Sequence, residues 1–315
     1  MKVRSVTLHL TGDEDLSIVE KFLDVAKAVD PATVRVSISP RGDVGRLIPR
    51  LRDLGVKYIS ALHLRYDADE VYSYVSQYGV FASLSDVVEY MRFLKRVHVG
   101  EVHLARYVAL SLGGAVYNSP YFPLSVTTRR GVSISLLYPN DLNSLEDVET
   151  VLKRGEEVGM QVASSLGVEF IGVDGSLSPW GHESVAKAVE RLFNIRLGAF
   201  GSHDAIYKIN QAIERAGVKK TGFNEVMLPV AEDEEIKRLV REGALNLDKL
   251  VSYTAVCVPG LDMAPVKIRE WGEVKRLLYD LAAISATKRR VIGVRIFPVD
   301  VDEYDVEGFG KTPAL

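Results

Sequence analysis

The chain has 315 residues, of which 47% are hydrophobic and 26% charged, a composition typical of a globular protein with a sizeable core. Its net charge of −3 argues against the basic surface that nucleic-acid binders use. A single cysteine excludes an internal disulfide and a cysteine-based zinc site, and no apolar run is long enough to span a membrane. The first residues lack the apolar segment of a signal peptide, so we expect a cytoplasmic protein.

Short β-branched runs alternate with longer amphipathic runs through the first hundred residues. The pattern predicts strands at 3–10, 33–40, 57–64 and 80–85, and helices at 15–29, 44–55, 67–79 and 85–97. Ser85 is the predicted cap of the last of these helices. Repeated units of this length place the strands in parallel, with the helices outside them.

A segment rich in glycine and proline, 113–126, precedes the second half of the chain. Strands are predicted at 133–139, 168–176, 224–233 and 289–299, helices at 144–166, 183–193, 203–217 and 271–287, a further helix from 234, and a short strand or loop at 254–260. No linker, low-complexity tract or repeat of fixed period interrupts this pattern. We therefore expect one α/β domain over 1–315, a closed barrel of eight to ten strands with outer helices.

Polar groups follow two of the predicted strands, where parallel α/β proteins place their active sites. Asp174, Ser176 and Ser178 follow the apolar run FIGV, 170–173, at the end of the strand predicted at 168–176, and they either reach into a cavity or form a turn that caps the next helix. Gly201 and Ser202 open another helix, where backbone amides either hold an anion or are simply capped.

Asn224 begins the run 224–233, whose closing acids Glu232 and Asp233 are interpreted as first-turn residues of the next helix in preference to metal ligands, the less favoured alternative. The aromatic residues of 118–123 stand between prolines and form either a cavity wall or a rigid connector.

The six histidines do not have the spacing of a zinc site, so the sequence predicts no metal centre. His9 and His63 lie within predicted strands and are interpreted as hydrogen-bonded core or rim groups. His182 and His203 follow the two strand ends described above and are kept as candidate proton carriers. Cys257, between Val256 and Val258, is either an inert core thiol or a reactive one, which needs exposure and a lowered pKa.

The motifs together resemble the uncharacterised family known as domain of unknown function 711, also called uncharacterised protein family 0210. They follow the family's order over nearly the whole chain, and the segments that carry the resemblance are VRSVTLHL, NSPYFP, IGVDGSLSP, GAFGSHDA, NEVMLPVAED, AVCVPGLDMAPV and VRIFPV with GFGKTPAL. The Cys-x-x-Gly-Leu-Asp and Asp-Gly-Ser-Leu-Ser-Pro elements are the specific ones. After Asp262 many members continue with a Pro-Gly-Asp loop, whereas this chain continues MAPVKIREWGE, so no role is carried over for that loop's acid.

The resemblance implies a barrel similar to those of pyruvate formate-lyase and the large subunit of ribonucleotide reductase. In those proteins about ten strands surround a central loop that has a cysteine at its tip, a position that corresponds to Cys257 here. The tail VEGFG, 306–310, lacks the arginine that precedes the glycine of glycyl-radical enzymes, so we expect no glycyl radical.

Two main classes of function follow, and the sequence names neither substrate nor cofactor. In a small-metabolite enzyme, Cys257 would be the nucleophile or redox thiol, Asp262 would orient it or take a proton, and Asp174 would be a second carboxylate. The predicted ligand-binding residues are Ser176, Ser178, His182, Gly201, Ser202, His203 and Asn224. The alternative is a non-catalytic metabolite-binding or regulatory protein using the same cavity. An assembly protein that acts as a homo-oligomer ranks last.

Overall fold

The strands of the computed structural model, which describes residues 1–12, 16–258 and 261–315, form two main sheets. One sheet has five strands in the order β3-β2-β1-β8-β9, and the other has four in the order β10-β11-β5-β4. The strand bounds are β1 Lys2–Leu10, β2 Thr33–Ile38, β3 Tyr58–Ser60, β4 Ala82–Leu84, β5 Val108–Leu112, β6 Val116–Tyr117, β7 Ser125–Val126, β8 Gly131–Leu137, β9 Phe170–Asp174, β10 Leu261–Lys267, β11 Ile292–Val299, β12 Glu303–Val306 and β13 Gly310–Pro313.

The helices lie between these strands in the sequence. Their bounds are α1 Ser17–Lys27, α2 Val44–Asp53, α3 Ala68–Tyr78, α4 Val87–His98, α5 Asp147–Leu166, α6 Val185–Phe193, α7 Ser202–Arg215, α8 Glu234–Arg241, α9 Leu247–Tyr253 and α10 Trp271–Lys288, with short 3-10 turns η1 Val102–Tyr107 and η2 Pro139–Asp141. The mixed α/β class and the alternation in the first hundred residues are thus confirmed.

Local chemistry explains where several helices begin and end. The Asp67 carboxylate accepts two backbone N–H bonds at the start of α3, and the Glu70 carboxylate accepts the N–H of Asp67. At the other end of the helix, Gly79 adopts the left-handed conformation that terminates it. The predicted cap at Ser85 is wrong, because the Asp86 carboxylate accepts the backbone N–H groups of Val88 and Glu89 in the first turn of α4.

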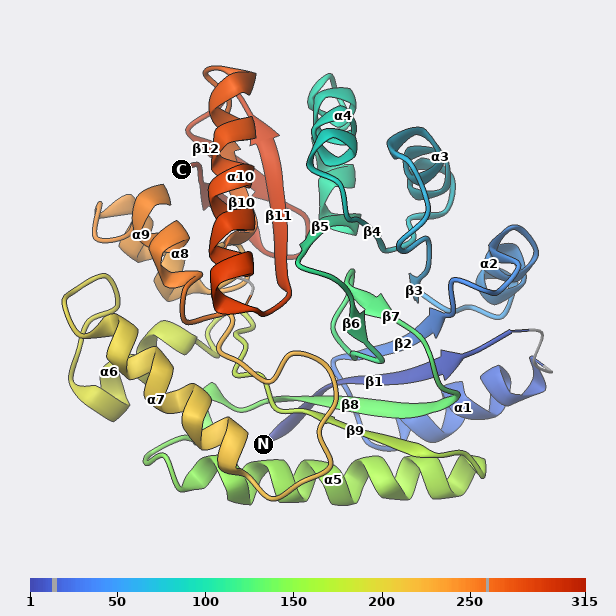
Figure 1. Cartoon of the computed structure of the whole chain (residues 1–315). Helices are drawn as coiled ribbons and strands as arrows, with labels where there is room; N and C mark the ends of the chain where they lie inside the picture. Colours follow the sequence, from blue (N-terminus) through green and yellow to red (C-terminus); the bar gives the residue numbers. More distant parts are fainter. Residues whose placement is uncertain (13–15, 259–260) are drawn as a thin grey trace.

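Helices cover the outer face of each sheet (Figure 1). Helices α1 and α5 pack on the five-stranded sheet, while α4 and α10 pack on the four-stranded sheet. The inner faces of the two sheets turn toward each other, and the segment that carries β6 and β7 lies between them. Neighbouring strands of the first repeats are parallel, as predicted, but β1 runs antiparallel to β8 and β5 antiparallel to β11.

Single bridges connect the edges of the two sheets. Ser60 pairs in parallel with Phe81, which joins the β3 edge to the β4 edge. At the other edges, residues 219–221 pair with β9 and residues 229–231 pair with β10. The prediction of a regular strand at 224–233 is wrong, because this run pairs with other strands only at isolated positions.

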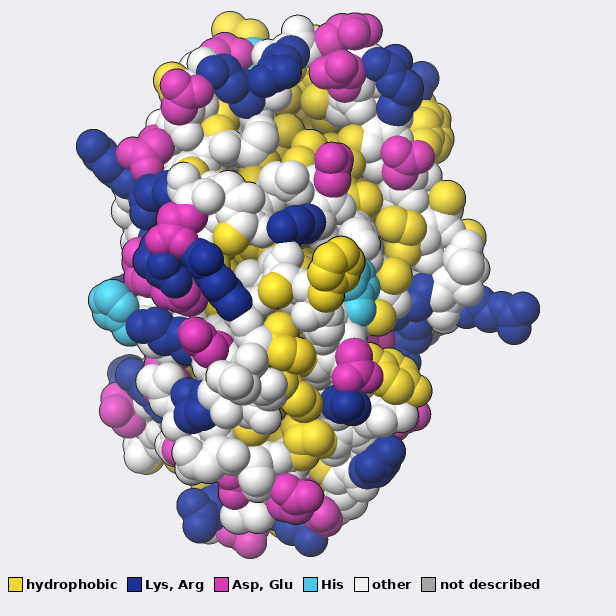
Figure 2. Space-filling model, turned by 90° about the vertical axis from the view of Figure 1, so that its left-hand side faces the viewer, with side chains coloured by type: hydrophobic (Ala, Val, Ile, Leu, Met, Phe, Trp, Pro, Cys, Tyr) yellow, Lys and Arg dark blue, Asp and Glu magenta, His cyan; other side chains and the backbone are white. Residues whose placement is uncertain are grey.

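Several strands and one helix were not predicted, namely β5, β6, β7, β10, α9 and the β12–β13 hairpin. Residues 254–258 of the predicted strand or loop at 254–260 are a turn, and 259–260 lie outside the described residues. The face seen in Figure 2 mixes acidic and basic side chains, with hydrophobic side chains gathered in a hollow in its upper half. None of the described helices is long and apolar enough to cross a membrane.

Two histidines are fully buried, His9 within β1 and His63 just after β3. The His9 ring bonds the hydroxyls of Thr127 at 2.9 Å and Ser133 at 2.7 Å. The His63 ring lies 2.9 Å from the Ser60 hydroxyl and 2.7 Å from that of Ser83. Both rings are therefore hydrogen-bonded core groups, as the sequence predicted. Burial lowers the pKa of each to about 3.

We expect Gly159→Ala to destabilise the protein by about 1–3 kcal/mol, because its β-carbon would lie only 2.3 Å from the Phe170 ring, which would have to move. Gly45→Ala is the matched control, since Gly45 is an exposed helical glycine whose β-carbon would make only ordinary contacts. It should leave stability unchanged or raise it by up to about 1 kcal/mol. Urea unfolding measures both, and equal effects would contradict the close packing of α5.

We expect the free energy of unfolding to fall by about 4 kcal/mol between pH 7 and pH 5 from His9 and His63 together. Their pKa is about 3 when folded but near 6.5 when unfolded, so the unfolded chain binds more protons as the pH falls below 6.5. His63→Gln should remove about half of this loss. His182→Gln, at an exposed histidine, should remove none, and an equal effect of both variants would refute the assignment.

Candidate binding site

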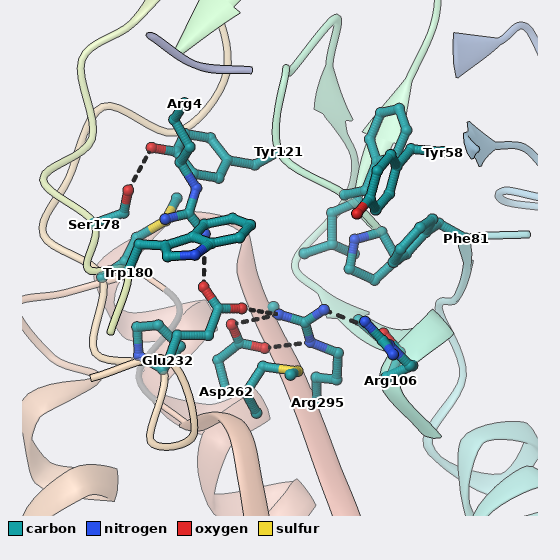
Figure 3. A pocket seen from close by; sticks show the side chains of 18 of the residues that line it. Arg4, Tyr58, Phe81, Arg106, Tyr121, Ser178, Trp180, Glu232, Asp262 and Arg295 are labelled. Atoms are coloured by element: carbon teal, nitrogen blue, oxygen red, sulfur yellow. Dashed lines mark hydrogen bonds and ion pairs between the residues drawn. The ribbon is translucent and has the colours of Figure 1, made fainter. Parts of the chain in front are cut away.

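A cavity of about 150 Å³ lies between the inner faces of the two sheets (Figure 3). Arg4 with Tyr121 and Trp180 stands on one side of it, and Tyr58 with Phe81 on the opposite side. Glu232, Asp262 and Arg295 form a third wall between them. The cavity thus combines buried charges with aromatic rings, which is the usual character of a small-molecule site.

Two β-bulges turn charged side chains into this cavity. Val3 pairs with Leu136 but Ser5 pairs with Ser135, so Arg4 is the extra residue in β1. It therefore faces the interior together with Ser5, instead of pointing to the opposite face. A similar register shift in β10, between Leu261 and Ala264, brings both Asp262 and Met263 into the cavity wall.

Regular alternation places the other two arginines. Successive side chains of a strand point to opposite faces, so Arg35 shares the inner face of β2 with Ser37. In β11, Gly293 and Arg295 line the cavity, whereas Val294 and Ile296 join the hydrophobic core. Each of these arginines stands inside a strand that is otherwise largely apolar.

The cavity carboxylates form one ion network with two arginines. Arg4 Nη2 donates to Glu232 Oε2 at 2.6 Å, and Arg295 Nη2 lies 3.5 Å from Glu232 Oε1. Arg295 also donates two bonds to Asp262, at 2.7 and 2.9 Å, in the bidentate geometry that suits a carboxylate. Burial raises the pKa of the Asp262 carboxyl, and the charge and hydrogen bonds of Arg295 oppose that rise.

Arg35 is held differently. Its Nε donates to the Thr33 hydroxyl at 2.8 Å and its Nη1 to the Pro120 carbonyl at 3.1 Å. Among the described residues no carboxylate forms an ion pair with it, although its exposed fraction is only 8%. Burial, together with the charge of Arg4, lowers the pKa of Arg35 to about 10, so the group stays charged at neutral pH.

The segment 118–123 forms a wall of the cavity, which is one of the two alternatives predicted for it. Tyr121 and Phe122 both line the cavity. The Tyr121 hydroxyl lies 2.7 Å from that of Ser178, one of the predicted ligand-binding residues, which lines the same wall. Burial raises the pKa of Tyr121 to about 12, so its hydroxyl is neutral and can donate a hydrogen bond.

Asp174 and Ser176 have a different position. Asp174 is fully buried, and its two oxygens accept bonds from the N–H groups of Ser176, Phe223 and Asn224 and from the hydroxyls of Ser176 and Ser119. A β-carbon on Gly222 would lie 2.0 Å from Asp174 Oδ2, so glycine is required beside this carboxylate. Burial raises the pKa of Asp174 while these hydrogen bonds oppose the rise. The geometry fits a carboxylate that orders the turn at 222–224.

The predicted ligand-binding residues His182, Gly201, Ser202 and His203 do not line this cavity. His182 and His203 are exposed, and His203 Nε2 lies 3.0 Å from the Ser252 hydroxyl. Gly201 and Ser202 begin α7, where Ser202 bonds the Ala199 carbonyl and the Gly198 N–H within one turn. Their roles in ligand binding stay predictions.

Asn224 lines a second, more open groove of about 810 Å³ on the outside of the molecule. Glu225 at its base pairs with Lys288 at 2.5 Å and with Arg290 at 3.0 Å. Lys288 also donates to the Cys257 carbonyl at 3.1 Å. These bonds fasten the loop around Asn224 to the end of α10.

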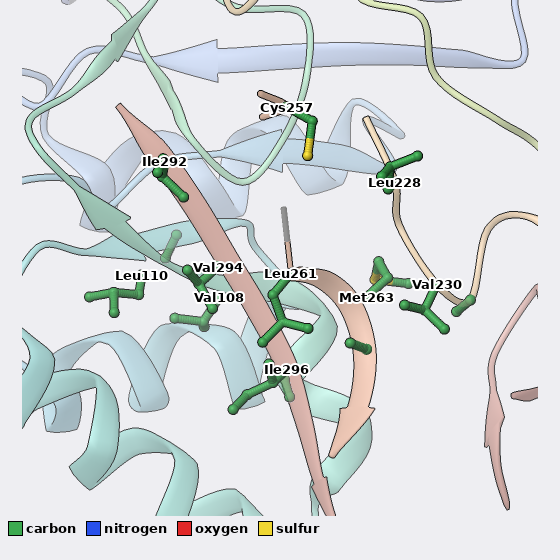
Figure 4. Close-up of a cluster of buried hydrophobic side chains, with 14 of the residues drawn as sticks. Val108, Leu110, Leu228, Val230, Cys257, Leu261, Met263, Ile292, Val294 and Ile296 are labelled. Carbon is green, nitrogen blue, oxygen red and sulfur yellow. The ribbon is translucent and has the colours of Figure 1, made fainter. Parts of the chain in front are cut away.

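Cys257 lies in the hydrophobic core near Leu228 and the strand β11 (Figure 4). Its exposed fraction is 0%, and burial raises its pKa to about 12, against the opposing charge of Lys288. A catalytic thiol needs a lowered pKa and access to substrate, and this position provides neither. The catalytic role of Cys257 stays a prediction. Within the described ranges, no cluster of three His, Cys, Asp or Glu side chains could hold a metal.

The sequence predicts a site role for Asp262 and Ser178 but none for Arg4, Arg35 and Arg295, and for Glu232 it favours a first-turn acid over a metal ligand. A signal for the arginines was available. Each interrupts a strand-forming run, in VRSVTLHL, TVRVSI and IGVRIFPV, where a charge costs free energy unless it has a partner. An arginine inside each of three different strands indicates that the strands surround an interior that contains charged groups.

Comparison with known proteins finds one matching family, described as Uncharacterised ACR (DUF711), over residues 143–304, just over half of the chain. UPF0210 proteins are similar to this chain. That of Campylobacter concisus is 34% identical over 167 residues, which cover 51% of this chain and 37% of that protein. Those of Methanosarcina barkeri and Methanopyrus kandleri are each 36% identical, over 47% and 52% of this chain. The matched part of the chain spans only 34–39% of the length of these three relatives.

We expect Cys257 to react with iodoacetamide at pH 8 about a thousandfold more slowly in the native protein than in urea. With a pKa of about 12 the native thiolate fraction is about three orders of magnitude below that of a thiol with a pKa of 9. The unfolded chain is the control, since it has the same single thiol. Rapid native alkylation would contradict the buried position and favour a catalytic thiol.

Proposed function

Since the chain belongs to the uncharacterised family DUF711, also named UPF0210, we propose a function from the geometry of its cavity: it binds a small anionic metabolite there. The observation that carries this proposal is Arg35, a buried guanidinium in the cavity wall without a carboxylate partner among the described residues. An isolated buried charge is costly, and an anionic ligand between Arg35 and Arg4 would remove that cost.

We further infer that the two sheets belong to one closed barrel, similar to the barrel that the family resemblance implies. The bridge from Ser60 to Phe81 supports this at one edge. At the other edge, the segment 219–231 bonds β9 through Val173 and β10 through Asp262. With nine strands in the two sheets, this segment would be the tenth. A cavity lined from both halves of the chain also supports a single domain over 1–315.

An enzyme acting on this metabolite is the second candidate. Asp262 and Ser178, both predicted from the sequence, line the cavity, and burial raises the pKa of the Asp262 carboxyl. Against turnover, Arg295 holds both oxygens of Asp262. Binding therefore has the stronger support, and turnover of a bound ligand would establish the enzyme.

We expect Arg35→Met to reduce the stabilisation of the protein by small anions. Acetate, benzoate, succinate and inorganic phosphate are the probes, and the shift in melting temperature is the measurement. Losing a charge-assisted hydrogen bond of about 1.5–3 kcal/mol should weaken binding by roughly ten- to hundredfold. Replacing a buried charge by an apolar chain of similar length is often neutral for folding, so the variant should remain folded.

Arg154→Met is the matched control, because Arg154 is an exposed residue of α5. It should respond to the probes as the unchanged protein does. If no probe stabilises the unchanged protein, or if Arg35→Met keeps the full shift, the proposal is wrong.

A further inference from the structure

We propose that the ligand of this cavity is a monocarboxylate whose apolar body is about the size of a six-membered ring. This inference rests on the proposed function, because it names the class of small anion that the same site takes. Three features carry it: the charge balance of the cavity, the way its arginines are stacked, and the size and lining of the remaining space.

The charges around the cavity leave one positive charge uncompensated. The described groups are four guanidinium groups and three carboxylates, namely Arg4, Arg35, Arg106 and Arg295 with Glu232, Asp262 and, paired with Arg106 at the rim, Glu307. A monoanion would bring this set to neutrality. A dianion would bury an excess negative charge, which is costly in a space with little water.

Aromatic rings cover the flat faces of the guanidinium groups of Arg4 and Arg35. The Arg4 guanidinium carbon lies 4.9 Å from the centre of the Trp180 ring and 5.4 Å from that of Tyr121. That of Arg35 lies 5.2 Å from the centre of the Phe122 ring. Stacking on the faces leaves the N–H edges to bind acceptors, and such an edge matches a planar carboxylate.

One N–H group of the Arg4 guanidinium, that of Nε, has no hydrogen-bond acceptor among the described residues. Its Nη1 donates to the Pro179 carbonyl and its Nη2 to Glu232, but its buried Nε has no hydrogen-bond partner among the described residues. Native proteins rarely leave a buried donor unsatisfied. A carboxylate oxygen at Arg4 would satisfy it.

Apolar side chains form most of the remaining wall. They come from both sheets and from the segments between them: Phe81, Phe122, Leu124, Phe223, Met227 and Met263. A space of about 150 Å³ is the size of an apolar cavity that accommodates benzene. The tip of the β12–β13 hairpin, with Phe309 packed 5.5 Å from Trp180, adds a further aromatic surface at the rim. The body of the ligand is therefore apolar and compact.

Four matched probes test the inference by titration calorimetry at pH 8, with the unchanged protein and with Arg35→Met. Benzoate has one charge and a ring, phenyl phosphate has close to two charges and a ring, benzamide has a ring and no charge, and acetate has one charge and no ring. We expect benzoate to bind at least about tenfold more tightly than each of the other three, because each lacks one matched feature. Arg35→Met should weaken benzoate binding at least about tenfold, and Arg154→Met should not change it.

The outcomes separate this inference from the proposed function. If phenyl phosphate binds as tightly as benzoate and Arg35→Met weakens that binding, the anion site stands and the monocarboxylate class is wrong. If acetate binds as tightly as benzoate and Arg35→Met weakens that binding, the anion site stands and the ring-sized apolar body is wrong. If benzamide matches benzoate, the charge does not select the ligand and the inference fails. If none of the probes binds, or if Arg35→Met leaves all affinities unchanged, both the inference and the proposed function are overturned.

Discussion

The carboxylate of Glu232 joins parts of the molecule that no continuous sheet connects. It accepts a bond from Arg4 in the five-stranded sheet and lies 3.5 Å from Arg295 in the four-stranded sheet. The residue itself lies in the turn that directly follows the segment 219–231, which bonds β9 and β10. This one buried group therefore holds the two inner faces at the separation that leaves a cavity between them. Without its charge, two arginines would face each other across the interior.

A buried ion network is rarely the most stable way to fill a protein interior, because each ion loses its hydration. Apolar side chains of similar volume would often stabilise the fold equally well or better. The charges here are not needed to build the core, which is formed elsewhere by apolar side chains. Their arrangement around an open space is better explained by a ligand, since recognition of an anion requires fixed donors in a place that water does not dominate. Asp174 shows the contrasting case, because all of its bonds lie within its own turn and its neighbours.

The repeated α/β pattern could be predicted because amphipathic periods of two and 3.6 residues alternate along the first half of the chain. The run 224–233 misled the prediction, since an apolar stretch such as VMLPVA has the same composition whether it pairs fully or only at isolated bridges. The site was predicted only in part. Asp262 and Ser178 could be predicted from their positions in sequence motifs. Arg4 points into the cavity because of a β-bulge, which reverses the direction of a side chain and has no sequence signature of its own. The contact between Asp174 and Gly222 joins residues far apart in sequence, and no local pattern reveals it.

The order in which the charged residues are synthesised has a consequence for the growing chain. Arg4 and Glu232 are 228 residues apart, so at ~5–20 residues per second the carboxylate follows its arginine by roughly 10 to 45 s. During that time the first strands present Arg4 and Arg35 on a face that is not yet covered. Charges that point inward from uncovered strands oppose edge-to-edge association with other chains. Arg4 and Arg35 would then oppose premature association of the uncovered strands, before the carboxylate that pairs with Arg4 has been made.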